Sequence, residues 1–273
     1  MTATRSPYLA GTAQATGTPS STAFTRWAVA AAAVFQIAAS SAPAFGFGEQ
    51  IGARSDDVRS LITPASWAFA IWGPLFLGSV VFAIWQALPA RAADPFVARL
   101  RWPAAGAFVG NGLWVLYTAN LGLSIGSVLI ISASLASILA AYRVVAKWEP
   151  RITRAHRWCA VLPLSALAAW LTAATIVNIT ATLKFYGVDA GASGPLVASA
   201  ILVVGGVIAG LALARGRGNP PYALVFLYAL YTIYAAGGQA DGSVAIGAMV
   251  AALLVVLGTV VGLRRADPGR WLG

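Results

Sequence analysis

The chain is a succession of long apolar runs separated by short polar segments. A bilayer crossing takes about 20 apolar residues in an α-helix, and most of the sequence falls into uncharged runs of about that length. We therefore predict an all-α, polytopic membrane bundle with eight spanning helices at about 27–46, 65–88, 102–121, 124–146, 158–182, 194–214, 221–238 and 243–263. Prolines at positions 89, 103, 150, 195, 220, 221 and 268 lie near the ends of these runs, where a missing amide donor costs little.

The remaining segments divide the chain into four parts. Residues 1–25 are rich in Thr, Ser, Ala and Gly, and we expect a disordered cytoplasmic tail there. Nine of the ten tryptophans lie between Trp27 and Trp170, so we expect a five-helix core over 26–182, a three-helix extension over 183–264, and a second cytoplasmic tail over 265–273. The first run ends in Ala42-Pro43-Ala44, which is similar to a signal-peptide cleavage site. We expect an uncleaved helix, although the charge pattern is the same in both cases.

The composition agrees with a membrane protein. Hydrophobic residues make up 59% and charged residues 10% of the chain, and a soluble domain could not hide that much apolar surface. The net charge of +10 would suit nucleic acid only if the basic residues shared one folded face. They lie instead in short loops, so we expect no nucleic-acid partner and take the lipid bilayer as the main one.

Basic residues predict the orientation. Arg54, Arg59 and Lys184 lie on one side of the predicted topology. Fifteen others lie on the opposite side: Arg5, Arg26, Arg91, Arg99, Arg101, Arg143, Lys147, Arg151, Arg154, Arg157, Arg215, Arg217, Arg264, Arg265 and Arg270. Because Lys and Arg are retained in cytoplasmic loops, we expect a multi-pass protein of the cell membrane with both termini in the cytoplasm.

Charged groups are absent from the predicted spans, where a buried carboxylate would mark a proton or cation site. Each Asp, Glu, Lys and Arg falls in a loop, in a tail or at a span boundary. The single Cys159 and single His156 provide no catalytic pair or metal cluster. We predict no catalytic residue, no metal site and no bound cofactor.

Aromatic rings and neutral amides do occur within the spans. An amide in lipid needs a partner, so these helix faces should point inward. Interfacial belts and helix packing would account for such residues, and so would a small-molecule pocket with apolar walls and few polar groups. On the second interpretation a cavity opening toward loop 47–63 has seven candidate ligand-binding residues: Trp67, Phe69, Trp72, Asn111, Trp114, Trp170 and Asn178.

Three of these stretches resemble a known family. The sequences TPASWAFAIW at 63–72, NGLW at 111–114 and WLTAATIVN at 170–178 are similar, in order and helix placement, to motifs of the tryptophan-rich sensory proteins (TspO/MBR, or translocator protein). The resemblance covers about 27–182 and implies a TspO-like five-helix core, here in a divergent member with three extra helices. It also implies a tetrapyrrole, or a sterol- or carotenoid-like compound, as the apolar planar ligand, and leaves a homodimer open.

Three functions are compatible with these observations. We expect a membrane receptor or carrier for an apolar planar molecule. A facilitative transporter of a small neutral solute is the first alternative, and an intramembrane enzyme that degrades a bound pigment is the second. Tyr228, Tyr231 and Tyr234 recur every third residue and either join the aromatic cavity or pack against the last helix.

Overall fold

The fold is all-α in a computed structural model that describes residues 19–267 and 269–272. No strand occurs among these residues. The main helices are α1 (Pro19–Ser41), α2 (Ile51–Asp57), α3 (Trp72–Ala87), α4 (Pro95–Leu121), α5 (Ile125–Lys147), α6 (Arg154–His156), α7 (Leu162–Phe185), α8 (Gly194–Arg215), α9 (Pro220–Ile233), α10 (Gly242–Arg264) and α11 (Gly269–Leu272).

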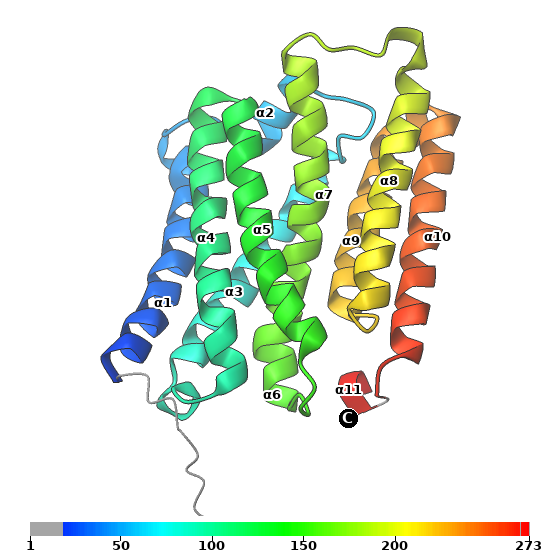
Figure 1. The fold of residues 1–273 in the computed structure, drawn as a ribbon. Coiled ribbons are helices and arrows are strands. Elements are labelled where there is room, and N and C mark those ends of the chain that lie inside the picture. Colours follow the sequence, from blue (N-terminus) through cyan, green and yellow to red (C-terminus); the bar gives the residue numbers. More distant parts are fainter. Residues whose placement is uncertain (1–18, 268, 273) are drawn as a thin grey trace, which may run out of the picture.

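The long helices form a bundle with α7 in its middle (Figure 1). On one side α4 lies between α1 and α5, and on the other α8 packs against α10. Helix α7 contacts α3, α5, α8 and α9, and its span is the most buried of those long and apolar enough to cross a membrane. A helix apolar on all sides is expected in such a position.

Seven helical segments of the described chain are long and apolar enough to span a membrane: Ala23–Phe45, Ser66–Ala87, Ile125–Lys147, Arg154–Phe185, Gly191–Arg215, Pro220–Gly238 and Gly242–Arg264. The protein is therefore a multi-pass helical membrane protein. Helix α4 is not among the seven, and it contains Arg99, Arg101, Asn111 and Asn120. Its 27 residues correspond to about 40 Å of helix, which is longer than the hydrocarbon core of a bilayer, so the predicted eighth crossing stays a prediction.

Helix α4 corrects two expectations from the sequence. It begins at Pro95, before the predicted residue 102, because the Asp94 carboxylate accepts hydrogen bonds from the amides of Phe96 and Val97 and caps the helix. Pro103 thus lies inside the helix rather than at its end. Arg101 also lies inside it and is 1% exposed, so charge is not confined to loops and boundaries.

Three predicted spans contain irregular turns. The second begins with a 3-10 segment, Ser66–Ile71, before α3. The fifth contains a π-helical turn, Arg157–Val161, just before Pro163, whose missing amide cannot continue regular helical bonding. The seventh ends in a π-helical turn at Tyr234–Gly238. These turns change the direction in which nearby side chains point. Trp67 and Phe69 lie in the first of these segments.

Glycines set the contact between α8 and α10. A Cβ added to Gly206 would lie 2.5 Å from Ala251 Cα, and one added to Gly258 would lie 2.2 Å from Gly210 O. Only residues without a side chain allow backbones to come this close. The spacing of small residues in these two helices therefore serves packing.

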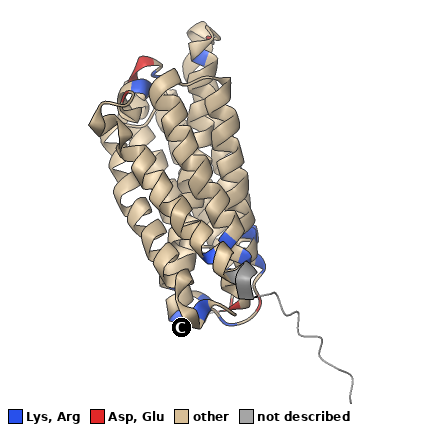
Figure 2. Ribbon diagram, turned by 90° about the vertical axis from the view of Figure 1, so that its left-hand side faces the viewer, with Lys and Arg blue, Asp and Glu red and all other residues tan. Residues whose placement is uncertain are grey.

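Charged residues gather at the two ends of the bundle (Figure 2). We call the end that carries α6 and α11 the basic end. The first described helix starts at this end and the C-terminal segment finishes there (Figure 1). An even number of crossings is therefore consistent with the course of the described chain.

The structure changes the predicted N-terminal tail and shows that the two predicted transmembrane parts are packed together. Helix α1 begins at Pro19, inside the segment predicted to be a disordered tail, while residues 1–18 of that segment lie outside the described residues. One cluster of buried apolar residues includes Leu167 and Trp170 before residue 182 and Phe226 and Val255 after it. The division at 182 stays a prediction from the sequence, and the two parts share one core.

Candidate ligand-binding site

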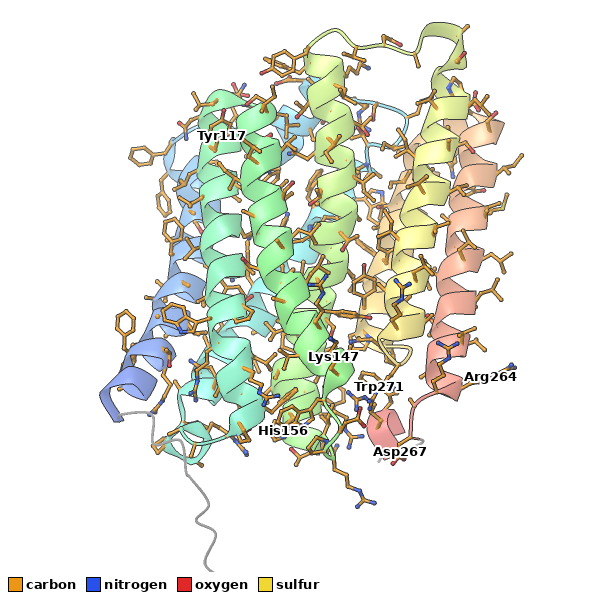
Figure 3. All side chains as sticks on the ribbon, viewed as in Figure 1. Tyr117, Lys147, His156, Arg264, Asp267 and Trp271 are labelled. Carbon is orange, nitrogen blue, oxygen red and sulfur yellow. The ribbon has the colours of Figure 1, made fainter. Side chains whose placement is uncertain are left out.

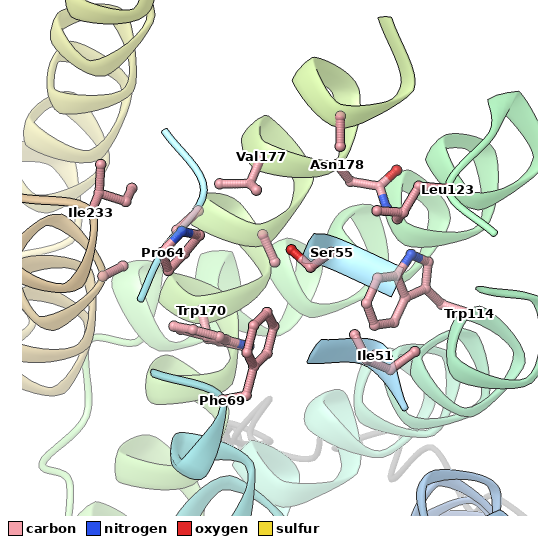
Figure 4. A pocket seen from close by; sticks show the side chains of 14 residues that line it. Ile51, Ser55, Pro64, Phe69, Trp114, Leu123, Trp170, Val177, Asn178 and Ile233 are labelled. Atoms are coloured by element: carbon pink, nitrogen blue, oxygen red, sulfur yellow. The ribbon is translucent and has the colours of Figure 1, made fainter. Parts of the chain in front are cut away.

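A cavity lies between α2, α4, α7 and α9, at the end of the bundle opposite the basic end (Figures 1 and 4). Its lining is almost entirely apolar and contains no charged side chain among the described residues. The residues are Ile51, Ser55, Pro64, Phe69, Trp114, Leu123, Trp170, Ala173, Ala174, Val177, Asn178, Ala181, Ala229 and Ile233.

One face of α7 supplies the largest part of the wall. Its lining residues fall at positions 170, 173, 174, 177, 178 and 181, the three- and four-residue spacing that keeps side chains on one side of an α-helix. Three of the six are alanine, and between Trp170 and Asn178 the lining side chains are Ala173, Ala174 and Val177, so the wall is shallow there. The small side chains leave the free space, and the two larger ones bound it.

Helix α2 and the segment after it cover the cavity. Ile51 and Ser55 of α2 and the buried Pro64 line it from this side. Polar contacts attach the covering segment to its neighbours: Arg54 donates to Ala119 O at 3.2 Å, Glu49 N donates to the same oxygen at 2.9 Å, Lys184 Nζ donates to Arg59 O, and Ala65 N donates to Thr232 O at 3.0 Å. Unlike α4, α7 and α9, it is a short helix joined to an irregular connection.

Aromatic rings support the cavity from behind. Trp170 meets Trp72 edge to face at 6.0 Å between ring centroids and Tyr228 at 6.4 Å, and Trp72 stacks on Phe76 at 5.4 Å. Each such pair stabilises by about 0.5–1.5 kcal/mol beyond the burial of area. The indole of Trp170 is therefore held in place by two other rings, one of which is itself stacked on Phe76.

Two indole N–H groups at the cavity have no acceptor. Trp114 is 5% and Trp170 3% exposed, and the Nε1 atom of each makes no hydrogen bond to another described group. A buried donor without a partner costs about 1–3 kcal/mol. Two tryptophans whose N–H groups have no acceptor among the described residues thus line an otherwise apolar wall, an arrangement suited to a ligand with acceptor oxygen atoms.

Asn178 presents its amide to the same space while bound at one end. Ser127 Oγ lies 3.0 Å from Asn178 Oδ1, and the Nδ2 atom has no partner. Since the two ends of an amide are assigned from their hydrogen bonds, the group facing the cavity is either the NH2 or the carbonyl. In both cases a polar atom of Asn178 is free to contact a ligand.

The structure brings together only part of the predicted set. Phe69, Trp114, Trp170 and Asn178 line the cavity, and Trp72 lies behind Trp170 as part of the ring cluster. Two residues lie elsewhere. Trp67 is 51% exposed and packs against the tyrosines of α9, and Asn111 donates to Gln36 Oε1 of α1 at 3.4 Å, which ties α4 to α1.

The tyrosines of α9 face the 66–69 segment rather than the last helix. Tyr228 and Tyr231 lie about 6 Å from Trp67 between ring centroids, and Tyr228 Oη donates to Ala68 O at 3.2 Å. This settles the alternative left open for these two residues. Through Tyr228 and Trp67, α9 holds the 3-10 turn that carries Phe69.

Sequence reasoning missed the lining from α2 and α9. Ile51, Ser55, Ala229 and Ile233 contain no distinctive side chain, and α9 is distant in sequence from the aromatic motifs. The alanines of α7 could have been found, because they share the helical face of Trp170 and Asn178.

The free space is small in this conformation. The cavity has a volume of about 50 Å³, whereas pockets for drug-sized ligands measure about 300–1,000 Å³. A planar ring system would enter only if part of the wall moved. Helix α2 and the segment up to Pro64 cover the cavity and form one side of that wall.

The fold and the cavity define a class: a multi-pass helical membrane protein with an aromatic, uncharged cavity near one end of its bundle. A family model described as TSPO-like protein matches residues 23–261, and the chain belongs to that family. The match includes α8, α9 and α10, beyond the 27–182 segment in which the motifs lie. No curated protein and no solved structure matches the chain.

Proposed function

We propose that this TSPO-like protein binds an apolar planar small molecule in the cavity between α2, α4, α7 and α9, as a receptor or carrier. The observation that carries the proposal is the pair of buried, unpartnered indole N–H groups of Trp114 and Trp170 at an otherwise apolar cavity. They would donate to ligand oxygen atoms, while the ring of Phe69 and the alanine face of α7 would contact its apolar surface.

The lining restricts the chemistry of the ligand. Burying a carboxylate without a cation or full hydrogen bonding is costly, and no described lining residue is charged. The buried part of the ligand should therefore be neutral, with carbonyl or ether oxygens. Any acidic substituent would lie outward, toward Arg54 and Arg59 in and after α2. A tetrapyrrole whose ring enters and whose acidic groups stay outside meets these conditions.

Entry requires α2 and the segment up to Pro64 to move outward, because the closed cavity is too small for a ring system. The hydrogen bonds that hold them, from Arg54, Glu49, Lys184 and Ala65, would be exchanged for contacts with the ligand. We further propose that the end with α2 faces away from the cytoplasm, since most Lys and Arg lie at the opposite end.

Protoporphyrin IX and its neutral dimethyl ester are suitable probes. Binding to the purified protein in detergent would be followed by the Soret absorbance of the porphyrin, which does not depend on protein tryptophan. Trp114→Phe and Trp170→Phe retain an aromatic ring and remove the donor together with part of the indole ring. Each should weaken binding about two- to tenfold, the effect of one lost hydrogen bond. Trp102→Phe, toward the basic end of α4 and 56% exposed, is the matched control.

Several outcomes would contradict this assignment. Unchanged affinity in both folded donor variants would place the site elsewhere, and equal weakening by the Trp102 control would indicate a general effect. Failure of wild-type protein to bind either probe would exclude this ligand class. Light-dependent consumption of the porphyrin would instead favour the enzyme, and flux of a small neutral solute into proteoliposomes without porphyrin binding would favour the transporter.

A further inference from the structure

Two adjoining cavities lie at the basic end, far from the site between α2 and α7. The larger has a volume of about 740 Å³ and lies among the α5–α6 connection, the α8–α9 connection and the C-terminal segment. The smaller, of about 450 Å³, is bounded by the start of the fifth span, the start of α9 and Trp271. Arg154 and Arg157 line both. Figure 3 shows Asp267 and Trp271 at this end, on the C-terminal segment.

The larger cavity is strongly basic. Six arginines line it: Arg151, Arg154, Arg157, Arg217, Arg265 and Arg270. Its only carboxylates among the described residues are Glu149, which is paired with Arg217, and Asp267, which accepts from Gly269 N at 2.9 Å. Four positive charges are left without a counter-charge. Such an excess around one concave space attracts anions.

Arg270 is the buried part of this cavity. It is 7% exposed and donates to Val145 O at 2.5 Å and to Trp148 O at 2.8 Å, so it caps the end of α5. Its Nε atom has no partner. Burial, together with the nearby charge of Arg217, lowers the pKa of Arg270 to about 10. The guanidinium thus occupies a position that an added negative charge would stabilise.

Retention of basic residues on the cytoplasmic side explains their presence at this end, but not their gathering around one cavity. Arg143, Arg215 and Arg264 belong to the same end and line neither cavity. The arginines around the larger cavity come from three segments that are far apart in the sequence: 151–157, the α8–α9 connection and the C-terminal segment. Only the fold brings them together.

The smaller cavity has a different character. Apart from the two shared arginines, its lining consists of Trp158, Val161, Leu162, Pro220, Pro221 and Trp271. Trp158 is 61% and Leu162 38% exposed, and both belong to a membrane-spanning segment. Tryptophan at the end of a span is typical of the level where lipid head groups meet acyl chains.

We propose that these two cavities together bind one anionic phospholipid, with its phosphate among the arginines and the start of its acyl chains along Trp158 and Leu162. An anionic head group matches the four unbalanced charges, and an apolar tail matches the adjoining groove. A free phosphate compound would use only the first of these features. The site is separate from the proposed ligand cavity and does not depend on its function.

Native mass spectrometry of the purified full chain tests this inference. Phosphatidylglycerol, phosphatidylcholine and inorganic phosphate would each be titrated against wild-type protein and two double variants. Arg154→Gln/Arg265→Gln removes two arginines from the larger cavity whose side chains make no hydrogen bond among the described residues. Arg215→Gln/Arg264→Gln removes the same charge from the same end and leaves both cavities intact.

We expect wild-type protein to bind one phosphatidylglycerol roughly tenfold or more tightly than phosphatidylcholine. The reason is that each basic residue near an anionic head group contributes about 1 kcal/mol to binding. This preference should fall at least tenfold in Arg154→Gln/Arg265→Gln and persist in Arg215→Gln/Arg264→Gln. Equal binding of the two lipids, or equal loss in both double variants, would overturn the proposal. Inorganic phosphate binding as tightly as phosphatidylglycerol would show a site for soluble anions instead of lipid.

Discussion

Arg101 is a buried charge that stabilises the bundle by capping. Its Nε donates to Gln86 Oε1 at 3.1 Å, and one terminal nitrogen donates to Arg91 O at 2.8 Å. The acceptors lie at the end of α3 and in the turn that follows, where carbonyl groups have no helical partner. A cation is favourable there because it meets the negative end of the helix dipole. This explains how a guanidinium is tolerated inside α4.

Asp94 joins three parts of the basic end. Besides capping α4, its carboxylate lies 2.8 Å from His156 Nε2 and 3.4 Å from Arg91. Burial would raise the pKa of Asp94, but the hydrogen bond from His156 and those from the Val97 and Phe96 amides outweigh it and hold the pKa below 3.8. The ionised carboxylate is therefore favoured by folding.

The sign of this pKa shift predicts an acid-labile contact. A carboxylate with a depressed folded-state pKa stabilises the fold above its unfolded value, and this stability is lost as the pH falls through the folded value. In Asp94→Asn the free energy of unfolding in detergent should be lower than in wild type at pH 7, by about 1–2 kcal/mol. The difference should shrink below about pH 4.

Asparagine also caps helices well, so the Asp94→Asn change isolates the charge. The same pH series on Asp57→Asn, whose side chain is 62% exposed, serves as the control and should follow wild type. A difference between Asp94→Asn and wild type that stays constant down to pH 2 would show that the ionised form contributes nothing.

At the scale of elements, the α8–α10 pair depends on glycine. Gly258→Ala would place a Cβ 2.2 Å from Gly210 O, so the two helices must separate. Overpacking of this kind costs about 1–3 kcal/mol, more than the gain of up to about 1 kcal/mol from replacing glycine by alanine in a helix. We expect a lower midpoint when unfolding in mixed detergent is followed by circular dichroism.

Gly242→Ala provides the matched control for this contact. It lies in the first turn of the same helix, and a Cβ there would meet nothing within 4 Å. Its midpoint should equal or exceed that of wild type. If Gly258→Ala behaved in the same way, the close approach of α8 and α10 would not exist in the folded protein.

At the scale of the whole molecule, the concentration of Lys and Arg at the basic end predicts orientation. Ala90 is exposed at the basic end and Ala190 at the other. In a Cys159→Ser background, Ala190→Cys should react with a membrane-impermeant maleimide. The reagent is added to cells whose outer envelope has been made permeable while the cell membrane stays intact. Ala90→Cys should react only after the membrane is permeabilised. The opposite pattern would reverse the topology. Ser55, which is 6% exposed, is a poorer reporter for the outer end.

The two parts predicted on either side of residue 182 are joined in one core. Tyr228 contacts both Trp67 and Trp170, and α9 supplies two lining residues of the candidate site. The family match over 23–261 likewise includes α8, α9 and α10. A variant truncated after α7 would therefore lack part of the cavity wall.

The hydrophobicity and periodicity of the sequence were enough to predict a helical membrane protein and the approximate positions of its spans. They also predicted the helical face that Trp170 and Asn178 share. These follow from the sequence because each depends on residues close together along the chain: a bilayer needs a long apolar run, and a helix brings residues three and four apart onto one side. The family resemblance rested on three such local stretches. Phe69, Trp114, Trp170 and Asn178 could be chosen as candidates on this basis.

Only the tertiary structure decided which faces meet. Helix α7 is apolar on all sides, so its pattern does not show which neighbour each face contacts. Trp67 and Trp72 are five residues apart in the same motif, yet the change from 3-10 to α-helix directs one toward α9 and the other behind Trp170. Asn111 and Trp114 share a helix, but one binds α1 and the other lines the cavity. Contacts between distant segments depend on how helices rotate and pack against one another, which local sequence does not encode.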